Sequence, residues 1–326
     1  MRAAFYTQNG EARDVLSVGD VETPQAGAGE VLVRVHASGV NPSDVKSRRG
    51  GPGRAMAFEK IVPHSDGAGI IETVGDGVSK DRIGERVWIW NGQWKRPFGT
   101  AAEFIAAPSA QAVSLPESVE FNAGACLGIP ALTAQHAVCV DEPVEGQWIL
   151  VTGGAGAVGN YAIQFAKMKG AKVIATVSSD KKAEVARTAG ADHVVNYKTD
   201  DVGAAVQDIT GGQGVDRIVE VDFGGNQNLI STCLKPGGLV VVYGSNDPAP
   251  TLSFFPLLVK GPRLRFFIVY ELPEAARAEG IDDINALIAS GDMHHVIAAE
   301  FPLDRIVDAH ELVESGTALG NVIVKP

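Results

Sequence analysis

The stretch WILVTGGAGAVG, residues 148–159, decides the fold. Its first four residues are apolar and have the length of a buried strand, and the segment from Asn160 to Lys169 has the apolar spacing of a helix. Between them, Gly154, Gly156 and Gly159 give the pattern G-x-G-x-x-G. The stretch therefore predicts a strand, a tight turn and a helix in direct succession.

The predicted turn has the chemistry of a dinucleotide-binding site. Glycine permits the tight turn, and without a Cβ its main-chain N–H groups can approach a pyrophosphate. The start of the following helix adds unpaired N–H donors and a partial positive charge. A Gly-rich turn alone occurs widely, but a strand before it and a helix after it favour dinucleotide binding over a merely structural turn.

The character of the chain changes on either side of this region. From Met1 to about Pro116, short runs rich in Val, Gly and Pro predict hairpins and bends. From about Phe121, apolar runs alternate with amphipathic stretches, which predicts βαβ units around a buried parallel sheet. After Ser245, four closely spaced prolines indicate the end of that domain. The remaining tail is too small to fold alone, so we expect it to pack on the first domain.

Composition restricts the classes of function. The 326 residues favour two domains, and 45% hydrophobic residues provide for a large core. Lys and Arg number 28 against 39 Asp and Glu, a formal charge of -11, so no nucleic acid is expected as a partner. No run is long and apolar enough for a membrane span, and no export signal is visible, so we expect a cytoplasmic protein. The three cysteines are far apart and are expected to be reduced thiols.

The strand after the predicted helix bears on the choice of dinucleotide. An NAD site usually has Asp or Glu at the end of this strand, to bind the ribose 2′-hydroxyl. Here the strand ends at Ser178 and Ser179, and we expect Asp180 to cap the next helix. Hydroxyl groups together with Lys181 and Lys182 suit a 2′-phosphate, which favours NADPH. The alternative is that both lysines belong to a solvated helix start.

The chain resembles the medium-chain dehydrogenase/reductase superfamily, and within it the zinc-free quinone oxidoreductase branch that includes the zeta-crystallins. The resemblance runs nearly from end to end. It is carried by SGVNP at 38–42, SDGAG at 65–69, VG at 74–75, GTAAE at 99–103, GIPALTA at 128–134, the glycine turn and GADHVVNY at 190–197.

This resemblance implies an α/β fold of two domains. A GroES-like, mostly-β catalytic domain is expected over residues 1–122, and residues 266–326 return to complete it. A Rossmann domain with a doubly wound parallel sheet is expected over 123–265, and NADPH lies in the cleft between the domains. The resemblance also implies a homodimer, or a tetramer, formed through an exposed edge of the Rossmann sheet.

The resemblance further assigns roles to particular residues. Ser178, Lys182 and Tyr197 surround the 2′-phosphate. Gly156, Ala157 and Val158 face the pyrophosphate. Ala157 stands where the branch often has Gly. Gly244 and Ser245 lie under the cofactor, Asn41 and Thr133 flank the nicotinamide and its ribose, and the backbone from Phe267 to Val269 holds the carboxamide. The full cofactor-binding set is Asn41, Thr133, Gly154, Gly156, Ala157, Val158, Gly159, Ser178, Lys182, Tyr197, Gly244, Ser245, Phe267, Val269 and Asn321.

No metal site is expected. A catalytic zinc needs three protein ligands, commonly Cys and His, and a structural zinc usually needs four closely spaced cysteines. Zinc-dependent relatives carry such ligands where this sequence has Asn41 and Ser65, and no cysteine cluster is present. His64 is expected to be a hydrogen-bonded core or cleft histidine rather than a shifted ligand.

The run KSRRGGPGR at 46–54 is the one local basic cluster. It is either a solvated mobile loop or a lip of the substrate cleft that attracts an anionic substrate or the cofactor phosphates. Quinone reductases often have tyrosines near the positions of Lys46 and Pro52, so this chain departs from the branch here.

The expected reaction transfers a hydride from NADPH to a quinone or a similar conjugated carbonyl without zinc. Asn41 is the candidate to hydrogen-bond the substrate or the ribose, Thr133 is placed beside it, and Asp44 and Lys46 are candidate proton-handling groups. Two alternatives stay open. One is an NADPH-dependent alkenal or 2-enoyl reductase, and the other is a non-catalytic, crystallin-like protein that binds NADPH.

Overall fold

The computed structural model describes residues 1–51 and 54–326. The chain divides into two compact units. The first contains Met1–Pro130 and His295–Pro326, and the second contains Ala131–His294. The first is mostly β and the second is built on a parallel sheet, so the predicted fold class is confirmed.

The second unit holds a six-stranded sheet in the order β10-β9-β8-β11-β12-β13, and every neighbouring pair is parallel. The strands are β8 (Trp148–Val151), β9 (Lys172–Val177), β10 (His193–Asn196), β11 (Val215–Glu220), β12 (Leu234–Val242) and β13 (Arg263–Phe266). The first strand, β8, lies in the middle of the sheet. The strand order runs from β8 outwards to β10 on one side, and from β11 outwards to β13 on the other, so it reverses between β8 and β11. Parallel sheets of this topology bind ligands at that point, beyond the carboxyl ends of the strands.

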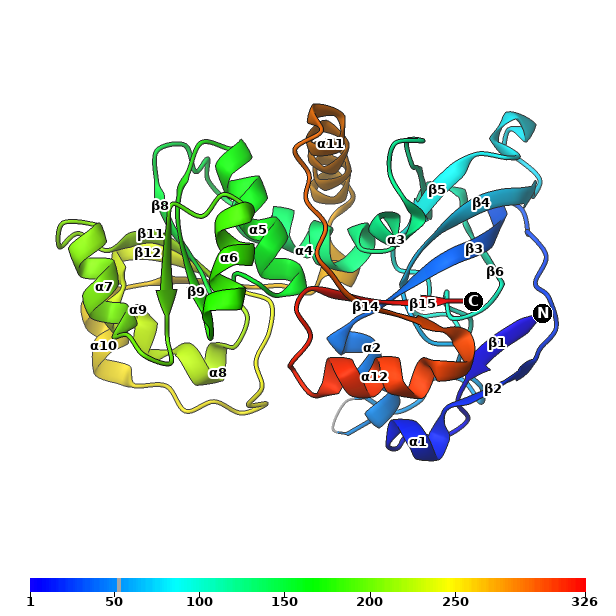
Figure 1. Ribbon diagram of the computed structural model, residues 1–326, viewed down its shortest axis with the longest axis horizontal. Coiled ribbons are helices and arrows are strands. Elements are labelled where there is room, and N and C mark those ends of the chain that lie inside the picture. The colour runs from blue at the N-terminus through cyan, green and yellow to red at the C-terminus, as the bar shows by residue number, and fades with distance from the viewer. Residues whose placement is uncertain (52–53) are drawn as a thin grey trace. The chain divides into compact units, whose positions relative to one another are not determined.

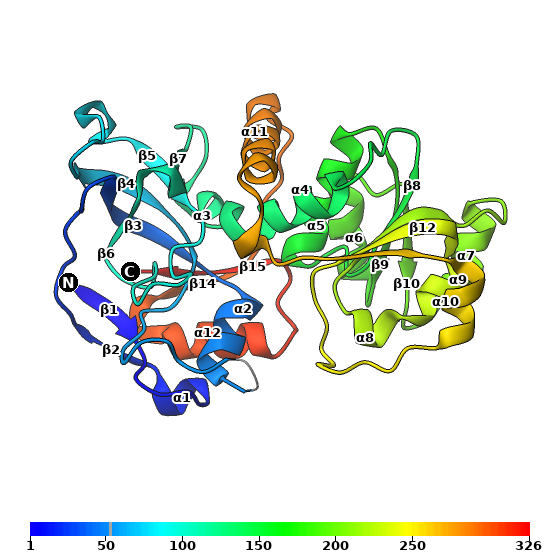
Figure 2. The same cartoon turned by 180° about the vertical axis from the view of Figure 1, so that it is seen from behind.

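Helices cover both faces of this sheet, as its near-continuous apolar strands require. Figures 1 and 2 show α5 and α6 on one face and α7, α9 and α10 on the other. The helices of the unit are α4 (Leu132–Cys139), α5 (Ala157–Met168), α6 (Asp180–Thr188), α7 (Val202–Ile209), α8 (Phe223–Asn226), α9 (Asn228–Thr232), α10 (Phe254–Lys260) and α11 (Glu274–Ser290), with a short 3-10 turn at Val269–Glu271.

The first unit is a strongly bent, mainly antiparallel sheet in the order β14-β15-β3-β4-β5-β7, with β6 also paired to β3. Its strands are β3 (Glu30–Val40), β4 (Asp66–Val74), β5 (Arg86–Ile89), β6 (Phe104–Pro108), β7 (Ala112–Ser114), β14 (Ile297–Pro302) and β15 (Asn321–Lys325), beside a hairpin of β1 (Arg2–Phe5) and β2 (Ser17–Asp20). Its α-helices are α1 (Ala12–Val15), α2 (Pro42–Arg49), α3 (Phe121–Gly124) and α12 (Ile306–Glu314).

The C-terminal segment completes the first unit, as expected for the tail. β15 pairs antiparallel with β3, and Val322 faces Val40 in this register. α12 packs beside α2, and Figure 1 shows the two helices close together under the sheet.

The expected return of the chain at residue 266 is wrong by about thirty residues. β13 pairs with β12 at the edge of the parallel sheet, and α11 packs against α4, so both belong to the second unit. The closely spaced prolines end a regular pattern in the sequence, but they do not end the domain.

Along the chain that the structure describes, no helix combines the length and the apolar character needed to cross a bilayer.

Candidate functional site

The glycine turn between β8 and α5 is packed too tightly for side chains. A Cβ on Gly159 would lie 2.2 Å from the carbonyl oxygen of Gly153, and a Cβ on Gly154 would lie 2.7 Å from the Cβ of Ala175 in β9. The N–H of Gly154 donates to the carbonyl of Thr176 at 2.9 Å. These contacts hold the turn against β9 and bring the helix start close to the strand ends.

The start of α5 presents open hydrogen-bond donors. Gly156 is the N-cap residue of this twelve-residue helix, and no side chain caps it. Gly156, Ala157 and Val158 are partly exposed, whereas Gly154 and Gly159 are buried. A helix start with uncapped N–H groups and a partial positive charge suits an anion such as a pyrophosphate.

The structure brings Ser178 and Tyr197 together at the ends of two neighbouring strands. Val177 faces Asn196 in the register of β9 and β10, and the N–H of Tyr197 donates to the carbonyl of Val177 at 3.0 Å. Lys182 follows in the first turn of α6. The predicted neighbourhood of these three residues therefore exists at one place on the sheet edge.

The cap of α6 is not the expected residue. Ser179 is the N-cap, and its hydroxyl accepts the N–H of Lys182 at 3.4 Å. Asp180 is the first helical residue, where its charge is favourable near the helix N-terminus. A Ser hydroxyl and an Asp carboxylate are both good N-caps, so the sequence does not distinguish them by residue type.

The remaining predicted residues of the second unit also follow strand ends. Gly244 and Ser245 lie two and three residues after the end of β12. Phe267 follows β13, and its N–H donates to the carbonyl of Val242 at 3.3 Å. Val269 opens the next 3-10 turn. Because the strands are parallel, these residues share one edge of the sheet with the glycine turn. Thr133 is a buried residue of α4.

A buried carboxyl group at the same sheet edge was not predicted. Glu220 ends β11 and accepts hydrogen bonds from the hydroxyl of Thr152 at 3.2 Å and from the amide of Asn226 at 2.9 Å. Burial raises its pKa, against the effect of these hydrogen bonds. The only signal in the sequence was a charged residue within the apolar run RIVEV.

In the first unit, Asn41 lies between two buried carboxyl groups. Its side-chain Nδ2 donates to Oδ2 of Asp66 at 2.8 Å, and its main-chain N–H donates to Oδ2 of Asp44 at 2.8 Å. Burial raises the pKa of Asp44 to about 7, and it raises the pKa of Asp66 well above its ordinary value. Asp66 stands in the quoted SDGAG motif, but sequence reasoning did not assign it a role.

The other predicted residues of the first unit have different surroundings. Lys46 lies on the exposed side of α2. Asn321 begins β15, and its side-chain amide donates to the carbonyl of Val296 at 3.1 Å, so this amide supports the local backbone.

The prediction of a solvated loop over the basic run is wrong for its first four residues. Residues 46–49 form the last turn of α2, and Arg48 is fully buried in an ion pair with Glu314 of α12. Arg48 also donates to the carbonyl of Gly10, so its charge stabilises the packing of α2. Residues 52 and 53 of the run lie outside the described residues.

His64 is a core histidine, as expected. Its Nδ1 lies 2.8 Å from the hydroxyl of Ser38, and its Nε2 lies 2.9 Å from Nε2 of His310. The two imidazole rings stack with their centroids 5.1 Å apart. Sequence reasoning missed the pairing with His310, which is 246 residues away along the chain.

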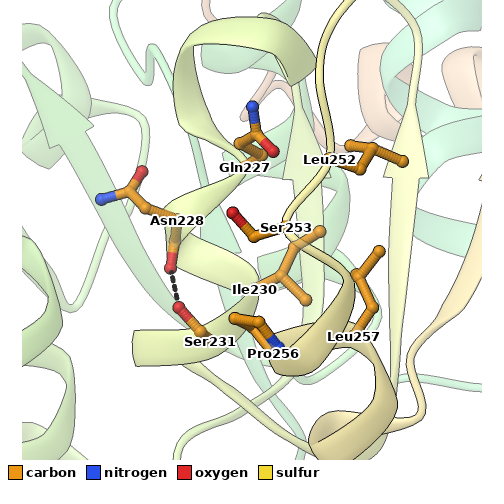
Figure 3. Close-up of a pocket in the computed structure, with 8 residues that line it drawn as sticks. All are labelled: Gln227, Asn228, Ile230, Ser231, Leu252, Ser253, Pro256 and Leu257. Carbon is orange, nitrogen blue, oxygen red and sulfur yellow. Dashed lines mark hydrogen bonds between the residues drawn. The ribbon is translucent and has the colours of Figure 1, made fainter.

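A surface pocket of about 120 Å³ lies elsewhere in the second unit (Figure 3). Asn228 and Ser231 of α9 form one wall, where the Ser231 hydroxyl donates to the carbonyl of Asn228 at 2.8 Å. Leu252 and Leu257 line the opposite side. No residue of the predicted cofactor set lines this pocket.

Comparison with known proteins identifies the family. Residues 27–117 match the family described as alcohol dehydrogenase GroES-like domain, and residues 157–286 match the one described as zinc-binding dehydrogenase. A quinone oxidoreductase from Rattus norvegicus is 33% identical over 99% of this chain and 97% of its own length. The chain belongs to the quinone oxidoreductase branch of the medium-chain dehydrogenase/reductase superfamily. This confirms the resemblance and places the chain among oxidoreductases.

Two further relatives bear on the substrate and on the cofactor. A 2-haloacrylate reductase from Burkholderia sp. is 30% identical over 94% of this chain and 94% of its own length. The crystal structure of Escherichia coli quinone oxidoreductase complexed with NADPH has a TM-score of 0.88, with 26% identity and full coverage of both chains.

The zinc in the family description does not fit the residues of this family member. At the positions where the resemblance places zinc ligands, the amide of Asn41 donates to a carboxyl group, and Ser65 is not a residue type that commonly binds zinc. Within residues 1–51 and 54–326, no three His, Cys, Asp or Glu side chains gather in a way that holds a metal ion.

The raised pKa of Asp44 predicts a pH-dependent stability. The folded protein retains a proton on this carboxyl group up to about pH 7, whereas the unfolded chain loses it near pH 4. The associated stabilisation is complete below pH 4 and is lost as the pH rises to 7, by at most about 4 kcal/mol.

Asp44→Asn keeps an acceptor for the N–H of Asn41, so we expect its free energy of unfolding to fall less between pH 5 and pH 8. Urea unfolding at both pH values measures this. Asp20→Asn, at an exposed position, is the control. If the free energy of unfolding of Asp44→Asn falls between pH 5 and pH 8 as much as that of the parent chain, the assignment is contradicted.

Proposed function

We propose that this protein is an NADPH-dependent oxidoreductase that transfers a hydride to a quinone or a similar conjugated carbonyl without zinc. The observation that carries the proposal is one sheet edge where an uncapped helix start meets a strand end with hydroxyl groups and a lysine. The NADPH complex of the Escherichia coli relative supports the same cofactor.

The glycine turn and the start of α5 would bind the pyrophosphate of the dinucleotide. A Cβ on Gly156 would have one atom within 4 Å, the carbonyl oxygen of Gly153, at a tight 3.2 Å. Main-chain N–H groups of Ala157 and Val158 would donate to the phosphate oxygens, and the helix dipole favours their negative charge.

The ends of β9 and β10 favour NADPH over NADH. Ser178 would donate its hydroxyl to the 2′-phosphate, Lys182 would supply a positive charge, and Tyr197 would cover the group with its half-exposed ring. No carboxylate ends β9 to bind a free 2′-hydroxyl, because Asp180 belongs to the first turn of α6.

Bound NADPH would supply the hydride, and the first unit would handle the substrate oxygen and the proton. The side-chain amide of Asn41 donates to Asp66, and Asp44 also hydrogen-bonds this side chain. We assign the amide of Asn41 to the substrate oxygen or the ribose. Asp44 is a proton-handling candidate because burial raises its pKa to about 7. Lys46 on the exposed side of α2 is the other candidate, and Thr133 is assigned to the nicotinamide.

The residue chemistry favours conjugated acceptors over simple ketones. Reduction of a simple ketone requires strong stabilisation of a localised alkoxide, which zinc supplies in other dehydrogenases. A quinone or an enone gives a delocalised anion, so hydrogen bonds from groups such as the amide of Asn41 suffice. A second candidate, reduction of an activated carbon–carbon double bond, is supported by the 2-haloacrylate reductase relative.

We expect NADPH oxidation to be fast with quinones, slower with enones and 2-haloacrylates, and at background level with simple ketones. Steady-state absorbance at 340 nm with a panel of these acceptors measures it, with NADH as the cofactor control. Faster turnover of enones or haloacrylates than of any quinone would select the second candidate. NADPH binding without turnover of any acceptor would select the non-catalytic, crystallin-like role.

Lys182→Ala tests the 2′-phosphate assignment. We expect the KM for NADPH to rise about tenfold to a hundredfold and the KM for NADH to stay unchanged, because only NADPH carries the phosphate. Arg187→Ala, at the exposed end of the same helix, is the matched control for loss of a positive charge. Equal effects of Lys182→Ala on both cofactors would refute the assignment.

We also propose that the protein forms a homodimer through the edge of the parallel sheet. β13 is the last strand in the sheet order, so one side of its backbone is available to a second strand. Large apolar side chains are exposed around it, which is typical of an interface. They are Leu252, Phe254, Phe255, Leu258, Val259, Leu264, Phe266 and Ile268.

Phe254 and Phe255 are 74% and 70% exposed, so a charge at these positions should prevent association without disturbing the core. We expect Phe254→Asp/Phe255→Asp to sediment as a monomer at concentrations where the parent chain is a dimer. Ile83→Asp, an exposed apolar position of the first unit, is the control. A variant that remains dimeric would place the interface elsewhere.

A further inference from the structure

Four buried side chains of the first unit form a continuous series of hydrogen bonds. Nε2 of His310 lies 2.9 Å from Nε2 of His64, and Nδ1 of His64 lies 2.8 Å from the hydroxyl of Ser38. The hydroxyls of Ser38 and Thr100 are 2.8 Å apart, and Thr100 donates to the main-chain carbonyl of Asp66. The series joins α12 to β3 and ends at the first residue of β4.

The last bond sets the direction of all the others. A carbonyl oxygen only accepts, so the single hydroxyl proton of Thr100 is used on Asp66, and Ser38 must donate to Thr100. Ser38 then has no proton left for His64, so Nδ1 of His64 must donate to Ser38. A neutral His64 has only that one N–H, so Nε2 of His310 must donate to Nε2 of His64.

Burial and charge agree with this direction. Burial lowers the pKa of His64 to about 3, so its ring is neutral and has one proton. The direction leaves Nδ1 of His310 as a lone pair, and this atom has no hydrogen-bond partner among the described residues. Arg48 acts on His310 with a positive charge, and its buried Nε–H is also unpartnered in the described part of the chain. A positive donor near this end favours an acceptor over a second N–H.

We propose that this one-way series, His310 to His64 to Ser38 to Thr100 to the carbonyl of Asp66, positions the Asp66 carboxyl group and through it the side-chain amide of Asn41. Thr100 fixes the peptide group of Asp66, and the carboxyl group of the same residue accepts from Asn41 at 2.8 Å. The role of Asn41 toward substrate rests on the proposed function, whereas the direction of the series does not. His64, Ser38 and Thr100 are positioning residues.

Thr100→Val tests the direction because it removes one hydroxyl and keeps the shape. Ser38 then loses its acceptor and can donate to His64, so we expect His64 to change from the Nδ1–H to the Nε2–H tautomer. Thr100→Ser restores the hydroxyl and should keep the original tautomer. Histidine 15N chemical shifts measure the tautomer, His64→Gln assigns the signal, and the exposed His193 is the internal control. An Nε2–H tautomer in the parent chain, or no change in Thr100→Val, overturns the series.

The positioning of Asn41 is measured separately from activity. We expect the side-chain amide protons of Asn41 to exchange with solvent at least tenfold faster in Thr100→Val and at the parental rate in Thr100→Ser. With an active acceptor, kcat should fall about tenfold in Thr100→Val, the value of one hydrogen bond. Unchanged amide exchange refutes the positioning role. Inactivity of the parent chain with every acceptor refutes the proposed function. The measurements of the His64 tautomer and of Asn41 amide exchange do not depend on activity and still test the series.

Discussion

The close approach of the glycine turn to its own helix is the contact on which the candidate cofactor site depends. A Cβ on Gly159 would lie 2.2 Å from the carbonyl oxygen of Gly153, a distance that no side chain tolerates. Only with glycine at this position can α5 begin directly beneath the end of β8. The helix start then faces the same edge as the ends of β9, β10 and β12, so that one steric condition places the proposed cofactor-binding residues of these segments at one edge of the sheet.

The first unit buries a cluster of polar side chains in its mostly β structure. Asn41, Asp44 and Asp66 are buried, and each has a hydrogen-bond partner in the others. Buried carboxyl groups favour the neutral form, and this is why the pKa values of both aspartates rise. A Cβ on Gly128 would lie 2.2 Å from Oδ1 of Asp66, so the carboxyl group is also confined sterically.

Local patterns in the sequence predicted the parts of the structure that depend on neighbours along the chain. The strand, turn and helix at 148–168 follow from apolar spacing and glycine, and the sheet edge follows because parallel strands end together. The return at residue 266 failed because β13 follows a proline-rich segment and is only four residues long. Ser179 and Asp180 could not be told apart as caps, since both side chains accept hydrogen bonds equally well.

Contacts between distant segments were beyond the sequence for a physical reason. Arg48 read as part of a solvated basic run, but folding places Glu314 beside it, and the pair compensates a charge that could not be buried alone. His64 and His310 are ordinary core histidines in the sequence, and their roles as donor and acceptor depend on the hydroxyl of Thr100, which is hydrogen-bonded to Ser38 and Asp66.

The surroundings of Asn41 in the first unit suit a hydrogen-bond donor better than a metal ion. A zinc site requires ligands that offer lone pairs to the cation, whereas Asn41 offers N–H donors, one of which Asp66 accepts. A hydrogen-bond donor at this place is suited to an oxygen that gains negative charge. Because an amide donates only along its N–H bonds, the side chain of Asn41 must be held in one orientation. The buried carboxyl groups around Asn41 supply that orientation.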